Sequence, residues 1–148
     1  MTDTCPIGSL KTILVATDGS LHSEKALYEA INLAKACGTK LYVMSVVEVN
    51  PEYEALAPQI VEKADEETKG FLDAAQKCAE REQVSCTTIV HRGEDPAHFI
   101  VEEAEKLKAD MIVMGKHGRN VMLRKLFVGS VTAKVISHAH CKVLVVPA

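Results

Sequence analysis

Five short runs of apolar residues divide this chain, and most are apolar at consecutive rather than alternating positions. They cover residues 13–16, 41–47, 87–90, 111–114 and 143–146. Consecutive apolar residues are typical of strands that are buried on both faces, as in a parallel sheet covered by helices. The pattern therefore predicts five buried strands.

Apolar residues at helical spacing fill the gaps between these runs, and after the second run they form a long stripe that predicts the buried face of a helix: Ile60, Ala64, Thr68, Phe71, Leu72, Ala75 and Cys78. Gly38 is a natural stop for the first helix, and Asp95 followed by Pro96 is a strong helix start, with Asp as cap and Pro in the first turn. Residues 50–58, which contain two prolines, are expected to form an exposed loop. The order βαβαβαβαβ predicts an α/β fold, a three-layer, doubly wound sandwich around a parallel sheet. We expect one domain over residues 1–148.

Composition narrows the function classes. The 148 residues are 47% hydrophobic and 25% charged, with a formal net charge of -3. The basic residues are scattered and lack interleaved aromatic residues, which argues against a nucleic-acid or membrane-surface protein. No run approaches a membrane span, and the first residues do not resemble a secretion signal. We expect a cytoplasmic protein.

The cysteines and a histidine pair are two further candidates for chemistry. Five cysteines, an odd number without a CxxC pair, favour reduced thiols over a disulfide framework or a common zinc site. The sequence does not say whether Cys5 or Cys141 is reactive. His138 and His140, just before Cys141, resemble a metal cluster, but histidines near a helix C-terminus are favoured by the helix dipole without a metal. We predict no metal site.

A glycine motif near the C-terminus is the most informative stretch. Met114-Gly115-Lys116-His117-Gly118 follows the fourth apolar run, and Gly129-Ser130-Val131-Thr132 opens the next helical pattern. Glycine lets the backbone approach a ligand closely, and a helix N-terminus presents N–H groups to an anion. The motif therefore predicts a phosphate site, most plausibly for a nucleotide.

Asp18 follows the first predicted strand, and the glycine motif follows the fourth. If these two strands are neighbours in the sheet, Asp18 lies opposite the glycine loop. There it would accept ribose hydroxyls, with the base near Val46 at the end of the second strand. The alternatives are that Asp18 caps the first helix together with Ser20 and that the glycines are ordinary loop glycines. The acidic residues Glu62, Asp65, Glu66 and Glu67 are interpreted as a solvated helix face.

These residues resemble the universal stress protein family over essentially the whole chain. The likeness rests on Val15-Ala16-Thr17-Asp18-Gly19-Ser20, on the glycine motif and on the closing Cys141-Lys142-Val143-Leu144-Val145-Val146-Pro147. It implies a Rossmann-like sheet of order 3-2-1-4-5, as in adenine-nucleotide-binding hydrolase-like folds, and a homodimer paired through the last strand, from Val143 to Val146. It also implies ribose contact by Asp18, adenine near Val46, phosphate contacts by Gly115, Gly118, Gly129 and Ser130, and further lining by Thr17, Met114, His117, Val131 and Thr132.

One departure concerns loop length. Ten residues separate Gly118 from Gly129, where the family pattern has nine. The resemblance implies a dimeric stress-response module that binds ATP or a related adenine nucleotide, with Mg²⁺ bridging its phosphates and protein partners that the sequence does not name. The alternatives are a slow ATP hydrolase using His117, for which no orienting partner is identifiable, and a nucleotide-free dimer. We assign no catalytic residue.

Overall fold

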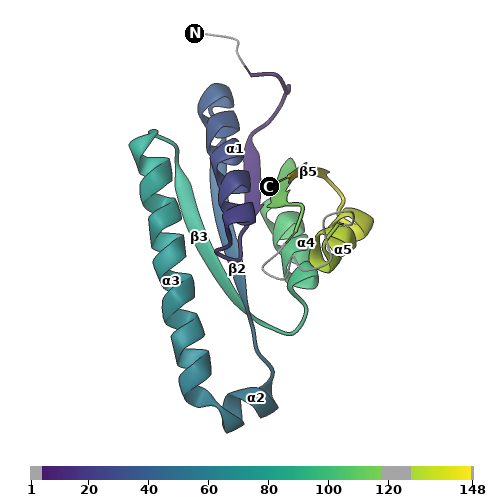
Figure 1. Ribbon diagram of the computed structural model, residues 1–148. Helices are drawn as coiled ribbons and strands as arrows, with labels where there is room; N and C mark the ends of the chain where they lie inside the picture. Colours follow the sequence, from purple (N-terminus) through teal and green to yellow (C-terminus); the bar gives the residue numbers. More distant parts are fainter. Residues whose placement is uncertain (1–4, 118–127, 148) are drawn as a thin grey trace.

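A computed structural model describes residues 5–117 and 128–147 and contains a five-stranded parallel sheet (Figure 1). The strand order is β3-β2-β1-β4-β5, which confirms the predicted α/β class and topology. The strands are β1 (Thr12–Ala16), β2 (Lys40–Glu48), β3 (Cys86–Gly93), β4 (Met111–Gly115) and β5 (Lys142–Val146).

Helices cover both faces of the sheet and give it three layers. They are α1 (Leu21–Cys37), α2 (Pro51–Leu56), α3 (Pro58–Arg81), α4 (Pro96–Leu107) and α5 (Ser130–His138). Within one strand, Ile13 and Val15 pack in the cluster under α1 and α3, whereas Leu14 packs in the cluster under α4 and α5. Both side-chain directions are therefore buried, which explains why the strands read as continuous apolar runs.

The predicted helix signals at two boundaries are confirmed. Gly38 ends α1 in the left-handed conformation at φ 64°, and its N–H donates to the Ala34 carbonyl. Asp95 caps α4 by accepting a hydrogen bond from the His98 amide. Within residues 5–117 and 128–147, no helix combines the length and the apolar character needed to cross a membrane.

The predicted loop over residues 50–58 is wrong, because the segment contains α2 and the first residue of α3. The Asn50 side chain caps α2 by accepting a 2.6 Å hydrogen bond from the Tyr53 amide. Pro51 and Pro58 each occupy the first turn of a helix, where their missing N–H costs nothing. The two prolines therefore start helices rather than mark a loop.

The expectation that all five thiols are reduced is also wrong. Cys5 and Cys37 form a disulfide across a sequence separation of 32 residues. The N-terminal segment passes the C-terminal end of α1, which brings the two Cα atoms to 4.6 Å. Neither residue count nor local spacing predicts this pairing, because only the tertiary fold brings the two segments together.

The free cysteines are Cys78, Cys86 and Cys141. Burial raises the pKa of the Cys86 thiol to about 11, with a further contribution from the Glu80 carboxylate. Burial also raises the pKa of Cys141. Both groups stay protonated at neutral pH, and a protonated thiol is a poor nucleophile.

Candidate functional site

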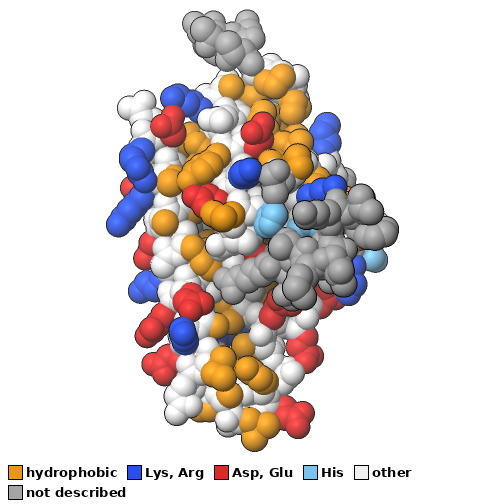
Figure 2. Space-filling model, viewed as in Figure 1, with side chains coloured by type: hydrophobic (Ala, Val, Ile, Leu, Met, Phe, Trp, Pro, Cys, Tyr) orange, Lys and Arg blue, Asp and Glu red, His pale blue; other side chains and the backbone are white. Residues whose placement is uncertain are grey.

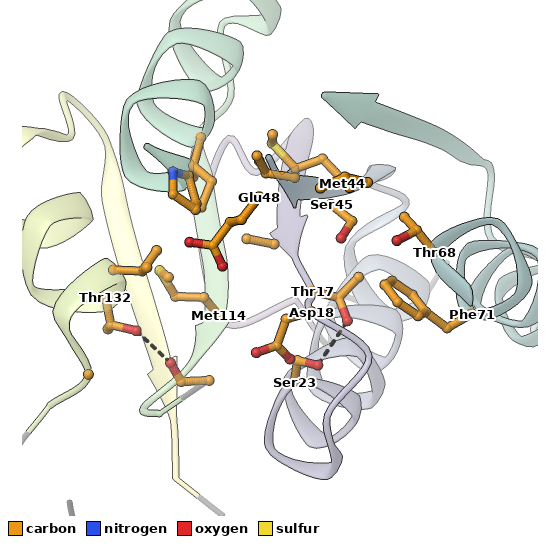
Figure 3. A pocket seen from close by; sticks show the side chains of 18 of the residues that line it. Thr17, Asp18, Ser23, Met44, Ser45, Glu48, Thr68, Phe71, Met114 and Thr132 are labelled. Atoms are coloured by element: carbon orange, nitrogen blue, oxygen red, sulfur yellow. Dashed lines mark hydrogen bonds between the residues drawn. The ribbon is translucent and has the colours of Figure 1, made fainter. Parts of the chain in front are cut away.

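A pocket with a volume of about 430 Å³ opens at the carboxyl ends of β1, β2 and β4 (Figure 3). The strand order reverses at β1, since the chain moves from β1 to β2 and β3 on one side and continues with β4 and β5 on the other. Ligands in open parallel sheets bind at such a switch point. The pocket is therefore where the topology favours a ligand.

The turn after β1 forms one wall through a chain of short hydrogen bonds. The Gly19 amide donates to Thr17 Oγ1, and this hydroxyl lies 2.8 Å from Ser23 Oγ. Asp18 Oδ1 accepts a 2.9 Å bond from the Ser20 amide, and Ser20 caps α1 by accepting from the Ser23 amide. The capping interpretation of this segment is thus confirmed for Ser20, while Asp18 fixes the turn and also lines the pocket.

Gly19 is required where this turn meets α3. Its φ of 80° is disfavoured for any side chain, and a Cβ placed there would lie 2.5 Å from the Phe71 ring. Figure 3 shows Phe71 beside Thr17, at the edge of the pocket. The aromatic ring on α3 therefore fits against the turn only because residue 19 has no side chain.

The second wall joins the end of β4 to the start of α5. A Cβ at Gly115 would lie 3.1 Å from the carbonyl oxygen of His22, so glycine allows the end of β4 to lie close to the first turn of α1. The buried Thr132 hydroxyl donates a 2.9 Å hydrogen bond to the Gly115 carbonyl. Gly129, the N-cap of α5, donates its own N–H to the Lys116 carbonyl and offers no side-chain cap, so the N–H groups left without a helical partner are those of the residues that follow it.

His117 lies between these two walls. Its side chain is buried, lines the pocket and makes an edge-to-face contact with His22, with ring centroids 6.0 Å apart. His22 Nδ1 is buried without a hydrogen-bond partner among residues 5–117 and 128–147. His117 therefore brings an imidazole ring to the pocket lining.

The structure brings ten of the eleven predicted site residues to this one pocket. They are Thr17, Asp18, Val46, Met114, Gly115, His117, Gly129, Ser130, Val131 and Thr132. Gly118 lies outside the described residues, together with the loop whose extra residue departs from the family pattern.

Sequence reasoning missed the wall that α3 and α4 supply. Ala64, Glu67, Thr68 and Phe71 of α3 and Pro96 and Ile100 of α4 line the pocket. The helical stripe that indicated a buried face contained Ala64, Thr68 and Phe71, but a stripe does not distinguish core from pocket lining. On the acidic face that was interpreted as solvated, Glu62, Glu66 and Glu67 are exposed; Glu67 also lines the pocket, and Asp65 pairs with Arg92.

Three carboxylates line the pocket. They belong to Asp18 on the turn after β1, Glu48 on β2 and Glu67 on α3, and Figure 3 shows the Glu48 carboxylate pointing into the cavity. The backbone N–H groups at the start of α5 lie on the side formed by β4 and α5. The pocket therefore offers a ligand carboxylate acceptors from three segments and backbone donors from the start of α5.

The histidines that resembled a metal cluster make other contacts. His138 Nδ1 lies 2.9 Å from the Lys134 carbonyl, and His140 pairs with Glu105 on α4 at 2.9 Å. In the described part of the chain, no group of three His, Cys, Asp or Glu side chains is arranged to hold a metal ion.

Comparison with known proteins places these features in a family. The sequence model of the universal stress protein family matches residues 9–147. A universal stress protein of Methanocaldococcus jannaschii is 42% identical over 140 residues, which cover 92% of this chain and 81% of the relative. The structure of UspA from Lactobacillus plantarum is similar with a TM-score of 0.83 at 26% identity, covering 93% of this chain and 97% of that one.

Two similar structures contain adenine nucleotides. A universal stress protein in complex with cAMP has a TM-score of 0.70 at 27% identity and covers 92% of this chain and 96% of that one. The Archaeoglobus fulgidus universal stress protein in complex with dAMP has a TM-score of 0.71 at 25% identity, covering 92% and 97%.

Proposed function

Because this chain belongs to the universal stress protein family, we propose that it binds ATP or a related adenine nucleotide in the pocket beside β1, β2 and β4. The observation that carries the proposal is the convergence of ten residues from distant segments on one pocket at the strand switch point. The complexes of similar proteins with cAMP and dAMP support the choice of adenine.

Each part of the pocket has a role in this proposal. Phosphates lie against the backbone of Gly115, Gly129 and Ser130, where an added Cβ at Gly115 would meet the neighbouring backbone. Asp18 accepts a ribose hydroxyl, and the base rests near Val46. Thr17, Met114, His117, Val131 and Thr132 complete the lining, and Gly118 stays a prediction.

Mg²⁺ would accompany a triphosphate here mainly through the phosphate oxygens and water. Either water or, in place of its ribose contact, the Asp18 carboxylate completes the shell, since magnesium prefers oxygen ligands and keeps several waters. An ion held in this way leaves with the nucleotide, so the pocket needs no dedicated carboxylate cage.

The wider role that we propose is a dimeric regulatory module in the cytoplasm, acting in a stress response through protein partners. β5 is an edge strand of the sheet, and residues 143–146 are half-buried. An apolar edge strand is a template for pairing with another chain, so the same strand of a second copy is the natural cover.

The Cys5–Cys37 disulfide is unusual for a cytoplasmic protein.

The test of nucleotide binding is the absorbance of the freshly purified protein at 260 and 280 nm, followed by chromatography of what denaturation releases. With three Tyr and no Trp, the protein absorbs weakly, so a carried nucleotide dominates the spectrum. Titration calorimetry of nucleotide-free protein with ATP, AMP, cAMP and GTP, each with and without Mg²⁺, then ranks the ligands. We expect adenine nucleotides to bind more tightly than GTP.

Asp18→Asn is the matched variant, because it keeps the oxygen that accepts from Ser20 and removes the charge. We expect ATP affinity to fall about tenfold or more, as for a lost charge-assisted hydrogen bond. Asp73→Asn, on an exposed position of α3, is the control and leaves affinity unchanged. A purified protein that is empty and takes up neither ATP nor AMP would contradict the proposal and favour the nucleotide-free dimer. Release of ADP from bound ATP would instead support slow hydrolysis.

A further inference from the structure

Three exposed apolar side chains gather where α2 meets α3. Tyr53, Leu56 and Ile60 are 45%, 80% and 56% exposed, and they make up three of the eight large apolar side chains that the described residues expose. We call these three residues the apolar tip. Figure 2 shows apolar side chains gathered at the lower end of the molecule, where Figure 1 places α2. Exposed apolar residues are ordinary when scattered, but a cluster marks an interaction site.

Acidic side chains surround the apolar tip. Residues 51–67 contain six carboxylates and a single cation, Lys63, although the whole chain has a net charge of only -3. Arg92 on β3 pairs with Glu54 and Asp65. The remaining carboxylates of the segment have no hydrogen bond or ion pair within residues 5–117 and 128–147; they are Glu52, Glu62 and Glu66, together with Glu67, which lines the pocket. The negative charge of the chain is therefore concentrated around the tip.

The elements that carry the tip are held in place. Asn50 caps α2, and Arg92 connects α2 and α3 to the end of β3. Val61, just after the tip, is buried. The tip is thus a preformed surface, and a partner does not pay to order it.

We propose that the apolar tip is the docking surface for a basic amphipathic helix of a partner protein. The apolar stripe of such a helix covers Leu56 and Ile60, and its flanking lysine or arginine side chains face the surrounding carboxylates. Charge complementarity argues for this occupant over two others. A second copy of this chain docked tip to tip would bring the acidic rims together, and an anionic lipid surface would be repelled.

The test uses a labelled peptide of about 18 residues, long enough for five helical turns, with a leucine stripe flanked by lysines. Fluorescence anisotropy at physiological salt measures its binding to the full chain. Amide chemical shifts report where it binds. We expect saturable binding, with shifts confined to residues 51–67 and their neighbours. The same peptide with glutamate in place of lysine does not bind.

Two pairs of variants separate the apolar contribution from the charge. Leu56→Ser with Ile60→Ser weakens binding at least tenfold, whereas Leu21→Ser, equally exposed at 77% but on α1, leaves it unchanged. Glu52→Gln with Glu62→Gln weakens binding and reduces its salt dependence, whereas Glu29→Gln on α1 does neither. Thermal unfolding of each variant checks that the fold is retained.

Three results would overturn the proposal. They are failure of the basic peptide to bind, equal binding to the Leu56→Ser, Ile60→Ser variant, and chemical-shift changes that map elsewhere. A fourth contradicting result could come from sedimentation of the wild type and of the Leu56→Ser, Ile60→Ser variant. Concentration-dependent assembly that this double variant abolishes would assign the tip to a second copy of the chain. None of these measurements involves a nucleotide, so their outcome is independent of the proposed nucleotide site.

Discussion

The two sides of the pocket are built in different ways. On the side of β1, β4 and α5, the exposed backbone at Gly115, Gly129 and Ser130 forms an important part of the surface, and short hydrogen bonds fix it, such as that from Thr132 to the Gly115 carbonyl. On the side of α3, side chains define the surface, and the helix is held by packing of Phe71 against Gly19 and by the ion pairs of Arg92. Only a few residue types can form the backbone side of the pocket, whereas many different side chains can form the side on α3.

This difference has a functional consequence for the proposed nucleotide site. Phosphates look alike in every nucleotide, so a backbone cradle of fixed geometry serves any of them. The wall on α3 lies beside the part of the pocket assigned to the base, and its side chains are the ones that distinguish one base or ligand from another. We expect substitutions on the backbone side to affect all nucleotides alike and substitutions on α3 to change their ranking.

The largest expected loss of unfolding free energy comes from a site outside both sides of the pocket, and it tests whether stability can change without changing nucleotide binding. The Cys5–Cys37 disulfide lies at the C-terminal end of α1, at the opposite end of the strands from the pocket. Replacing both cysteines with serine lowers the free energy of unfolding by about 3–4 kcal/mol, from the loop-closure entropy of a loop of this size. Urea unfolding measures the loss, and calorimetry shows unchanged ATP affinity. A lower affinity would mean that stability and binding cannot be separated in this protein.

The backbone side was also the part of the site that the sequence predicted. Gly115, Gly129 and Ser130 could be assigned because few residue types serve at a close approach or a helix start. Likewise, consecutive apolar residues in β1 predicted a strand buried on both faces. Phe71 could not be assigned, because an aromatic residue in a helical stripe is normally core, and its contact with Gly19 joins segments 52 positions apart. The Cys5–Cys37 disulfide could not be predicted either, because it also joins segments that only the tertiary fold brings together. Helix α2 was not predicted because its prolines were interpreted as a loop signal rather than as helix starts.

The next effect tests the contact between the two sides. Gly19→Ala places a side chain at φ 80° against the Phe71 ring, and we expect a loss of about 2–4 kcal/mol in unfolding free energy from left-handed strain and overpacking together. In a Phe71→Ala background the clash is gone, so the same substitution costs only about 1–2 kcal/mol for the strain. A double-mutant cycle in urea measures this coupling. Equal costs in both backgrounds would mean that the two sides do not meet at Gly19.

A matched pair of threonines compares the two sides directly. Thr132→Val leaves the Gly115 carbonyl without its buried donor, and we expect a loss of about 1–3 kcal/mol in unfolding free energy. Thr68→Val removes a 2.7 Å hydrogen bond to the Ala64 carbonyl, which keeps its helical partner, so the loss stays below about 0.5 kcal/mol. Thermal unfolding of both variants measures the difference. A larger loss for Thr68→Val would reverse the assignment of the hydrogen-bonded side.

The smallest effect concerns the ion pairs that connect α3 to β3. Arg92→Gln removes the pairs with Glu54 and Asp65, and since all three side chains are well exposed to water, we expect a loss below about 1 kcal/mol in unfolding free energy. Lys35→Gln, which removes the 2.8 Å pair with Glu82 far from the pocket, is the control with a similar loss. The two variants differ in binding. Arg92→Gln loosens the start of the α3 wall, next to Ala64, and lowers ATP affinity by about two- to threefold, whereas Lys35→Gln leaves it unchanged. High salt screens the pairs and should narrow the difference in ATP affinity between the wild type and Arg92→Gln at the same salt concentration. Equal ATP affinity of the two variants would show that packing alone positions α3, and that the side-chain wall is as firmly set as the backbone wall opposite.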